Sequence, residues 1–262
     1  MDRAAFKLFA TLEADHWWFR GRRELYLPLL RHVLEQDAGG APDTQGPDTQ
    51  SRVLDVGCGV GGFLAPLASF GDVSGCELDE ASVGFCRELG RDNTFVAASD
   101  QLPVPDGSQD LISLFDVLEH TPDDGPVLTE VLRALRPGGH VVVSVPAYQF
   151  LYANNDRVAH HFRRYTRGDL VTRLTAAGLE VRKATYVNVV LGAVIIPIVL
   201  LQKLKETLFP VQQDDTTNLS WRVPRPVNAA LARIFAGERH LLRHVNAPFG
   251  HSLFAVARRP PR

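Results

Sequence analysis

Residues 53–63 read Val53-Leu54-Asp55-Val56-Gly57-Cys58-Gly59-Val60-Gly61-Gly62-Phe63. The apolar start of this stretch predicts a buried strand that ends beside an acidic residue, and the glycines predict a tight turn into a helix. Glycine suits such a turn because the backbone takes conformations that a Cβ atom disfavours and because a ligand can then approach the main chain. The stretch therefore predicts a nucleotide-cofactor site on an α/β fold.

Two acidic residues indicate which cofactor this turn would bind. Three glycines satisfy the dinucleotide pattern G-x-G-x-x-G: Gly57, Gly59 and Gly62. Asp55 precedes them, and its carboxylate would repel a pyrophosphate and attract a cation. Glu77 ends the next predicted strand, 72–77, where a carboxylate can accept hydrogen bonds from both hydroxyls of a ribose. S-adenosylmethionine, with its ammonium, sulfonium and ribose, fits this pair of acids.

Five blocks of the sequence, in this order, resemble the class I S-adenosylmethionine-dependent methyltransferases. They are residues 53–59, 75–79, 102–108, 116–120 and 135–139. The resemblance implies a Rossmann-like sheet of seven mostly parallel strands flanked by helices, with the last strand, 252–258, antiparallel. It also extends to a bacterial subgroup associated with small-molecule and glycan genes.

The resemblance implies where the cofactor would bind. Asp55 and the glycine turn would hold its methionine part, and Glu77 would hold its ribose. The family usually has an acid where this chain has Ala98, so Ser99 and Asp100 are the expected adenine contacts. The predicted cofactor-binding residues are Asp55, Gly57, Cys58, Gly59, Glu77, Leu78, Ser99, Asp100, Asp116 and Val117.

The segment 116–120 follows an apolar strand predicted at 110–115, whose carboxyl end would face the ligand crevice. His120 is a predicted general base toward the methyl acceptor, since its unperturbed pKa is near neutral. Alternatively, Glu119 and His120 cap the next helix and hold the crevice wall. By resemblance, this acid-x-x-Glu-His pattern is linked to a divalent metal in quinone-biosynthesis O-methyltransferases. One such cluster without further ligands predicts no metal site here.

The polar segment 156–165, beyond the fifth strand of the predicted core, indicates a loop that faces the substrate. By resemblance, its His-x-Arg-Arg-Tyr-Thr pattern marks the bacterial subgroup. His161, Arg164 and Tyr165 are the predicted acceptor-site residues, and His161 and Tyr165 join His120 as catalytic candidates. The alternative is a solvated loop whose arginines pair with surface acids.

Residues 2–36 predict two helices with an aromatic segment, 16–20, between them. By resemblance, the N-terminal helix would cover the cofactor, and the tryptophans of this segment would exclude water. The alternative is an aromatic anchor that ties the helices to the sheet. Residues 38–50, rich in Gly, Pro, Asp and Thr, predict a flexible linker.

Residues 187–201 form the most apolar stretch, which contains Pro197 and is too short to span a bilayer. We expect this stretch to be buried against the sheet or in a homodimer contact. Alternatively, it lies at a membrane interface, with Lys203 and Lys205 following, and meets a lipid-linked acceptor.

Composition narrows the class of protein. A net charge of -2 over 262 residues gives no electrostatic case for a nucleic-acid partner. The three cysteines lack paired spacing, and the first residues have no apolar signal-peptide core, so a cytoplasmic setting is expected. The expected organisation is a helical cap and linker (1–50), a cofactor-binding core (51–186) and an extension with the final strand of the same domain (187–262).

The predicted reaction is in-line transfer of a methyl group from S-adenosylmethionine to an O- or N-nucleophile of a small molecule or sugar. One alternative is a non-methylating enzyme, or a helper subunit, that binds the cofactor on the same fold. The other is a nicotinamide-dependent oxidoreductase, against which Asp55 argues.

Overall fold

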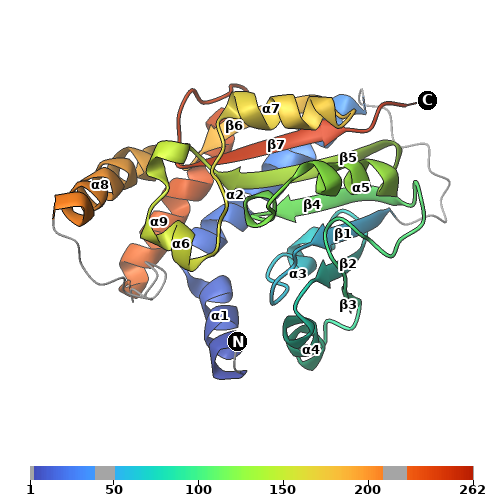
Figure 1. The fold of residues 1–262 in the computed structure, drawn as a ribbon, viewed down its shortest axis with the longest axis horizontal. Coiled ribbons are helices and arrows are strands. Elements are labelled where there is room, and N and C mark those ends of the chain that lie inside the picture. Colours follow the sequence, from blue (N-terminus) through green and yellow to red (C-terminus); the bar gives the residue numbers. More distant parts are fainter. Residues whose placement is uncertain (1–2, 39–50, 209–222, 262) are drawn as a thin grey trace.

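The computed structural model describes residues 3–38, 51–208 and 223–261, and in this part seven strands form a single sheet (Figure 1). The strands are β1 (Arg52–Val56), β2 (Asp72–Glu77), β3 (Thr94–Val96), β4 (Gln109–Phe115), β5 (Leu135–Pro146), β6 (Glu180–Val187) and β7 (Ser252–Arg258). Their order is β3-β2-β1-β4-β5-β7-β6, and only β7 runs antiparallel to its neighbours. The predicted seven-stranded, mostly parallel sheet with an antiparallel last strand is confirmed.

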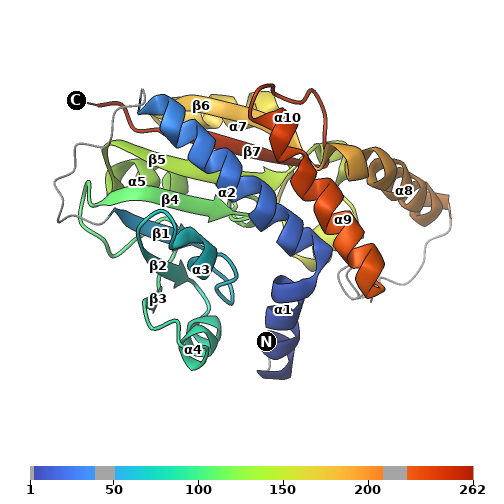
Figure 2. The ribbon, with the colours of Figure 1, turned by 180° about the vertical axis from the view of Figure 1, so that it is seen from behind.

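Helices cover both faces of this sheet. They are α1 (Arg3–Asp15), α2 (Trp17–Asp37), α3 (Leu64–Leu67), α4 (Glu80–Glu88), η1 (Leu118–His120), α5 (Gly125–Ala134), η2 (Gln149–Leu151), α6 (Asn154–Val158), α7 (Arg167–Ala176), α8 (Val189–Leu208), α9 (Arg225–Gly237) and α10 (Arg239–Leu242). Helices α5 and α7 lie on the face seen in Figure 1, and α2, α9 and α10 lie on the face seen in Figure 2. The central strands β4 and β5 are therefore covered on both sides, which explains their nearly continuous apolar sequences.

The boundary between the first two helices differs from the prediction. The aromatic segment was expected between them, but α2 begins at Trp17 and continues through Pro28. His16 is the N-cap of α2, and its ring accepts a hydrogen bond from the Trp18 amide. A side chain that satisfies a free amide at a helix start favours a new helix at that position. Most of the predicted linker, 39–50, lies outside the described residues.

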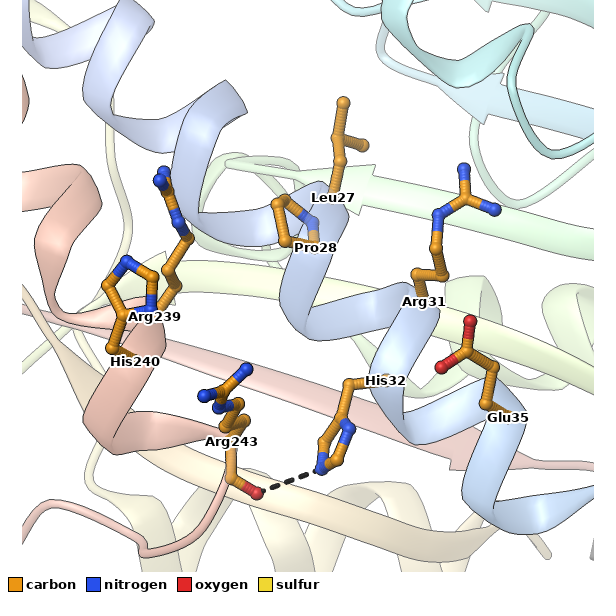
Figure 3. A pocket seen from close by; sticks show the side chains of 8 residues that line it. All are labelled: Leu27, Pro28, Arg31, His32, Glu35, Arg239, His240 and Arg243. Atoms are coloured by element: carbon orange, nitrogen blue, oxygen red, sulfur yellow. Dashed lines mark hydrogen bonds between the residues drawn. The ribbon is translucent and has the colours of Figure 1, made fainter.

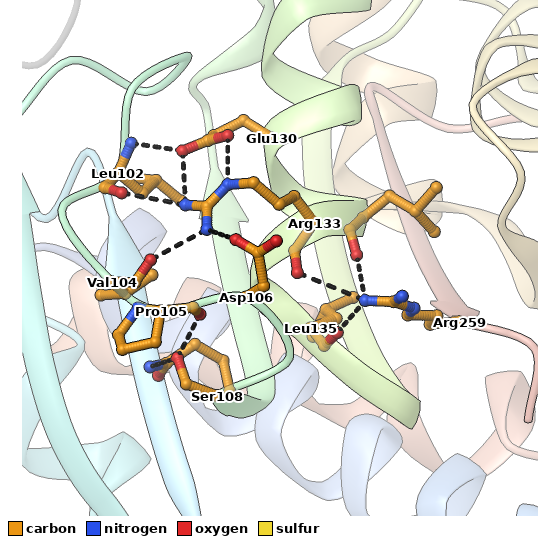
Figure 4. A network of polar contacts seen from close by, with 11 residues as sticks. Leu102, Val104, Pro105, Asp106, Ser108, Glu130, Arg133, Leu135 and Arg259 are labelled. Carbon is orange, nitrogen blue, oxygen red and sulfur yellow. Dashed lines mark hydrogen bonds and ion pairs between the residues drawn. The ribbon is translucent and has the colours of Figure 1, made fainter.

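The loop between β3 and β4 is fixed by Arg133 of α5 (Figure 4). The Arg133 guanidinium donates to the carbonyl oxygens of Leu102 and Val104 at 3.0 and 2.9 Å and pairs with Glu130 and Asp106. Glu130 in turn accepts the Leu102 amide at 2.7 Å. These contacts hold the loop that follows Ser99 and Asp100 against the body of the domain.

The expected burial of residues 187–201 against the sheet is wrong, whereas their burial in a homodimer contact stays a prediction. Most of this stretch forms α8, which projects from the body of the molecule (Figure 1), and many of its apolar side chains are exposed. Within the described part of the chain, no helix combines the length and apolar character that crossing a bilayer requires.

Candidate active site

The carboxyl ends of β1, β2 and β4 meet around the glycine turn that follows β1. The amides of Gly57 and Cys58 both donate to the Cys76 carbonyl, at 2.8 and 3.0 Å, which fixes the turn against β2. Gly57 and Gly59 have φ angles of 71° and 57°. A Cβ atom on Gly57 would lie 2.7 Å from Val117 Cγ2, so the turn also packs closely on the residues after β4. The structure thus brings together the predicted residues from these three strand ends.

Glu77 lies at the end of β2 with its carboxylate against the turn. One carboxylate oxygen accepts the Gly59 amide at 3.0 Å, and the other accepts the Leu78 amide at 2.8 Å. A carboxylate offers about four acceptor positions, so this group retains capacity for two ribose hydroxyls. The Leu78 side chain is 70% exposed, so it is available to a ligand at this edge.

Asp55 is buried beneath the same turn. It is 3% exposed and accepts a hydrogen bond from the Ser113 hydroxyl at 2.6 Å. Burial raises the pKa of its carboxyl group to about 7, against the opposing effect of the Ser113 hydrogen bond. The neighbouring charges of Glu13 and Glu77 raise it further. A bound cation would lower the pKa of Asp55 again, because it would stabilise the ionised carboxylate.

Glu13 is a candidate site residue to which sequence reasoning gave no role at the cofactor; the sequence suggested it only as part of a Glu-x-x-His pair with His16 that rarely binds metal alone. It extends from α1 to the glycine turn, so close to Gly62 that a Cβ atom there would collide with it. One of its oxygens is buried and has no hydrogen-bond partner among the described residues. Burial raises its pKa to about 7, and Arg91 is the strongest opposing charge. Glu13 is thus the third carboxyl group around the turn, after Asp55 and Glu77.

The other predicted cofactor residues are placed as follows. Cys58 is buried, and its thiol lies where a Cβ atom of Gly75 on β2 would be 2.9 Å away, so it packs the turn onto the sheet. Ser99 and Asp100 follow β3 in a turn that Arg133 stabilises from the other side of the loop. Their contact with an adenine ring stays a prediction.

Asp116 is held by a residue from the other end of the sequence. Its carboxylate pairs with the Arg22 guanidinium at 2.6 Å and accepts a hydrogen bond from Ser144 at 3.3 Å. Arg22 belongs to α2, is only 3% exposed and lies 5.4–5.9 Å from the centres of the Trp18, Tyr26 and Phe63 rings. Arg22 therefore couples α2 to the crevice, a contact that no local pattern could predict.

A second cluster joins Glu119 and His120 of η1 to His161 of the loop after α6. Their ligand atoms lie within 4.8 Å of one another, and the two imidazole rings are 4.6 Å apart between centres. Glu119 is fully buried, and neither carboxylate oxygen has a hydrogen-bond partner among the described residues. Burial raises the pKa of Glu119 well above its ordinary value. Partial desolvation, and then the nearby His161, lower the pKa of His120.

His161 is oriented by an ionised acid. Its Nδ1 atom lies 2.8 Å from Asp156 Oδ1, and Arg164 Nε lies 2.8 Å from the same oxygen. Burial opposes ionisation of Asp156, but the hydrogen bonds from His161 and Arg164 hold its pKa at about 2. Because an ionised carboxylate only accepts, Nδ1 of His161 carries the proton and Nε2 is the basic nitrogen. Arg164, 8% exposed, supports this pair; it does not line an open acceptor site as predicted.

Tyr165 is a second correction to the predicted acceptor site. It is 1% exposed, and its hydroxyl donates to the buried Asp124 at 3.0 Å. Burial and the Asp124 charge raise its pKa, so the phenol stays protonated. Asp124 also pairs with Arg173 of α7 at 2.5 Å. Tyr165 is therefore part of the core that supports the loop, because its ring and its hydroxyl are both satisfied internally.

The N-terminal helices combine the two roles that the sequence left open. Trp18 packs against Phe235 of α9 and His251, with ring centres 5.5 and 6.0 Å apart, as expected of an aromatic anchor. Helix α1 instead lies over the glycine turn, with Phe6 stacked on Phe85 of α4 at 5.6 Å. Together with Glu13, this contact makes α1 a cover for the crevice.

A surface pocket between α2 and α10 stands apart from both clusters (Figure 3). It is lined by Leu27, Pro28, Arg31, His32, Glu35, Arg239, His240 and Arg243, none of which belongs to the strand ends or the glycine turn. His32 Nε2 lies 3.1 Å from the Arg243 carbonyl, and Arg31 and Arg239 donate to backbone carbonyls. The contacts of His32 and Arg239 hold α2 and α10 together, and the Arg31 contact with Ser69 holds α2 to the segment after α3.

The chain is similar to known methyltransferases. The family model described as "Methyltransferase domain" matches residues 54–143. The "Ubiquinone biosynthesis O-methyltransferase" of Pseudomonas paraeruginosa is 30% identical over 209 residues, or 70% of this chain and 85% of that protein. The enzyme of the same name from Thiobacillus denitrificans is 28% identical over 71% of this chain and 86% of that protein. The fold matches an S-adenosylmethionine-dependent methyltransferase from Mesorhizobium loti with TM-score 0.51 and 19% identity, over 86% of this chain and 98% of that one.

Proposed function

The chain belongs to the class I S-adenosylmethionine-dependent methyltransferases, and we propose that it methylates a hydroxyl oxygen of a small molecule or sugar. The observation that carries this proposal is the imidazole of His161, oriented by an ionised Asp156 beside His120 and Glu119. Such a cluster supplies the base that a hydroxyl nucleophile needs. A neutral amine already has a free lone pair, so an N-nucleophile would make less use of it.

The cofactor side of the site has the residues to hold S-adenosylmethionine. Glu77 would accept the ribose hydroxyls, while Asp55 and Glu13 would lie near the positive ammonium and sulfonium groups. The buried Glu13 oxygen without a partner, and the raised pKa values of Glu13 and Asp55, fit a crevice completed by a cation. When bound, the cofactor supplies an electrophilic methyl carbon and a thioether leaving group.

The protein then has three tasks in the reaction. Helix α1 would limit the access of water to the crevice, which strengthens the electrostatic interactions inside. The strand ends would align the acceptor oxygen with the methyl carbon for in-line attack. His161 Nε2 would receive the proton that the hydroxyl loses, and Asp156 would stabilise the resulting imidazolium. His120, at the mouth of the cluster, is the second candidate for this base.

A metal-assisted form of the same reaction is a second candidate, favoured by the buried carboxylate of Glu119. One carboxylate and two imidazoles within 4.8 Å are a donor set that divalent transition metals accept. Glu119, His120 and His161 would hold the ion, and the ion would acidify the acceptor hydroxyl. The sequence predicted no metal because the segment of η1 alone supplies too few ligands. In the structure the third ligand, His161, comes from a loop 41 positions after His120.

The test is release of S-adenosylhomocysteine from S-adenosylmethionine with a catechol, a hexose or a primary amine as the acceptor probe. We expect turnover with a hydroxyl acceptor and a loss of kcat of about 100-fold or more in His161→Ala. His240→Ala, an exposed histidine of α10, is the matched control and should keep full activity. Running each assay with and without a chelator separates the metal-assisted form from the metal-free one.

Tight cofactor binding without release of S-adenosylhomocysteine from any acceptor would favour a non-methylating enzyme or a helper subunit. Methylation of the amine alone, with His161→Ala fully active, would contradict the hydroxyl acceptor and the assigned base. Absorbance of a bound nicotinamide in the purified protein would support the oxidoreductase alternative.

A further inference from the structure

Helix α8 is apolar around its whole circumference in its first fourteen residues, 189–202, which contain no charged side chain. A helix of this kind is normally covered on all sides, in a protein core or in a membrane. In this structure it is covered on one side, by α9, by η2 and by the residues before β7, where Gly192 packs against His251.

The uncovered side forms a continuous apolar stripe. Its large side chains are 48–66% exposed and recur at intervals of three and four residues, which places them on one face of the helix. They are Val190, Val194, Ile198, Leu201 and Leu204. Because monomeric proteins rarely expose an apolar patch of this extent, the stripe indicates a contact surface.

The charges beside the stripe favour a lipid surface over a second copy of the chain. Helices α8 and α9 carry one acidic residue, Glu206, but four basic ones. They are Lys203, Lys205, Arg225 and Arg233. The whole chain has a net charge of -2, so its positive charge is locally concentrated here. A symmetric dimer through this face would bring the same cations together, whereas anionic headgroups would complement them.

One exposed aromatic side chain lies beside α8, and another lies beside the catalytic cluster. Lys203 of α8 donates to the Phe150 carbonyl at 2.7 Å, and Phe150 is 54% exposed. Phe162 is 55% exposed, and its amide donates to the Glu119 carbonyl at 2.7 Å. An acceptor with an apolar tail held in the lipid could therefore present its polar end to His161.

We propose that α8 and α9 dock on an anionic lipid surface, with α8 lying in the plane of the interface, and that the acceptor is lipid-linked. The second part rests on the proposed methyl transfer to a hydroxyl, and it specifies the class of molecule that carries that hydroxyl. The docking itself requires no catalytic activity.

The experiment is co-flotation of the full chain with phosphatidylcholine vesicles that contain or lack phosphatidylglycerol. We expect binding to the anionic vesicles that weakens with salt, and loss of about 90% of the bound fraction in Ile198→Asp/Leu201→Asp. Lys205→Gln should weaken binding about fivefold without altering the apolar stripe. The control is Leu89→Asp, which adds a single negative charge at an exposed leucine beside α4 and should bind like the native chain.

The proposal is overturned if the native chain does not float with anionic vesicles, or if the double variant and Lys205→Gln both bind like the native chain. It is also overturned if sedimentation shows a dimer that the double variant abolishes, because a second copy would then cover α8. Calorimetry with S-adenosylmethionine on the double variant should give native affinity. If the protein binds anionic vesicles but transfers no methyl group to a soluble hydroxyl probe, the docking proposal is supported. In that case only the proposed methyl transfer to a hydroxyl is rejected.

Discussion

The proposed cofactor crevice around the glycine turn and the proposed acceptor cluster around His161 lie at the same edge of one sheet but are assembled in different ways. The crevice comes mainly from one continuous segment, 53–77, in which a strand, a turn and a second strand fix the acids relative to the glycines. The cluster joins η1 to a loop about 40 residues later, with supporting contacts from α5 and α7. A site built from one continuous segment can be predicted from a sequence motif. A site built from distant segments can be recognised only once the fold brings its residues together.

The two regions also differ in what their charges can do. The crevice concentrates carboxyl groups, two of which have pKa values raised to about 7, so its charges suit a positively charged ligand. The cluster pairs one ionised acid, Asp156, with an imidazole, so it is suited to receiving a proton. Arg22 connects them, because it reaches from α2 to Asp116 at the border of both.

We expect the largest effect from a substitution that removes the Arg22–Asp116 ion pair. Arg22→Met leaves the Asp116 carboxylate, which is 35% exposed, without its buried partner, and we expect this to lower the free energy of unfolding by about 2–3 kcal/mol in urea titrations. Arg20→Met, which removes an exposed ion pair with Glu24 at 3.7 Å, should change it by less than about 0.5 kcal/mol. If both variants change the free energy of unfolding by the same small amount, the Arg22–Asp116 pair does not link the crevice to the cluster.

The second prediction concerns catalysis by the acceptor cluster alone. Asp156→Asn removes the charge that orients His161, and we expect kcat to fall about 100-fold while the affinity for S-adenosylmethionine stays within about twofold of native. The readouts are steady-state kinetics and calorimetry on the same preparation. Asp156→Glu should restore part of kcat, since it retains the charge, and a KM effect without a kcat effect would reduce Asp156 to a structural role.

The pH dependence of cofactor binding isolates the crevice. Asp55 and Glu13 must be ionised to attract a cation, and their pKa values of about 7 predict that affinity rises with pH from about 6 to about 8. Each carboxyl group is about 9% ionised at pH 6 and about 91% ionised at pH 8, so each should raise the affinity about tenfold over this whole range. Binding should release protons, and Glu13→Gln should remove part of that release in calorimetry across buffers. A flat profile would place both acids outside the cofactor contact.

The smallest expected effect concerns the N-cap of α7, which begins next to the cluster. Thr166 caps α7 in a box with Asp169, and its hydroxyl accepts the Asp169 amide at 3.2 Å. Thr166→Ala should cost about 1 kcal/mol in thermal or chemical unfolding. Thr175→Ala, near the exposed end of the same helix, should cost little or nothing. A similar loss in both variants would attribute the effect to the helix in general.

The sequence predicted those features whose determinants are close together along the chain. Strands 72–77 and 252–258 are found at their predicted positions because turns and apolar runs mark both ends. Tyr165 was misassigned because its polar neighbours suggested exposure, while its hydroxyl is in fact satisfied by Asp124. The roles of Glu13 and Arg22 were missed because their partners lie in segments that only the tertiary fold brings near. Burial of α8 was expected from composition alone, which cannot tell which surface covers an apolar helix.

The most direct test of the cofactor crevice is calorimetric titration of S-adenosylmethionine into the native chain, Glu77→Ala and the control Glu80→Ala. The two Glu77 carboxylate oxygens accept the Gly59 and Leu78 amides and retain capacity for ribose hydroxyls, so we predict a loss of affinity of about 100-fold or more in Glu77→Ala. Glu80, an exposed acid in the first turn of α4, should be replaceable without effect. Native affinity in Glu77→Ala would contradict the assignment of this crevice to the cofactor.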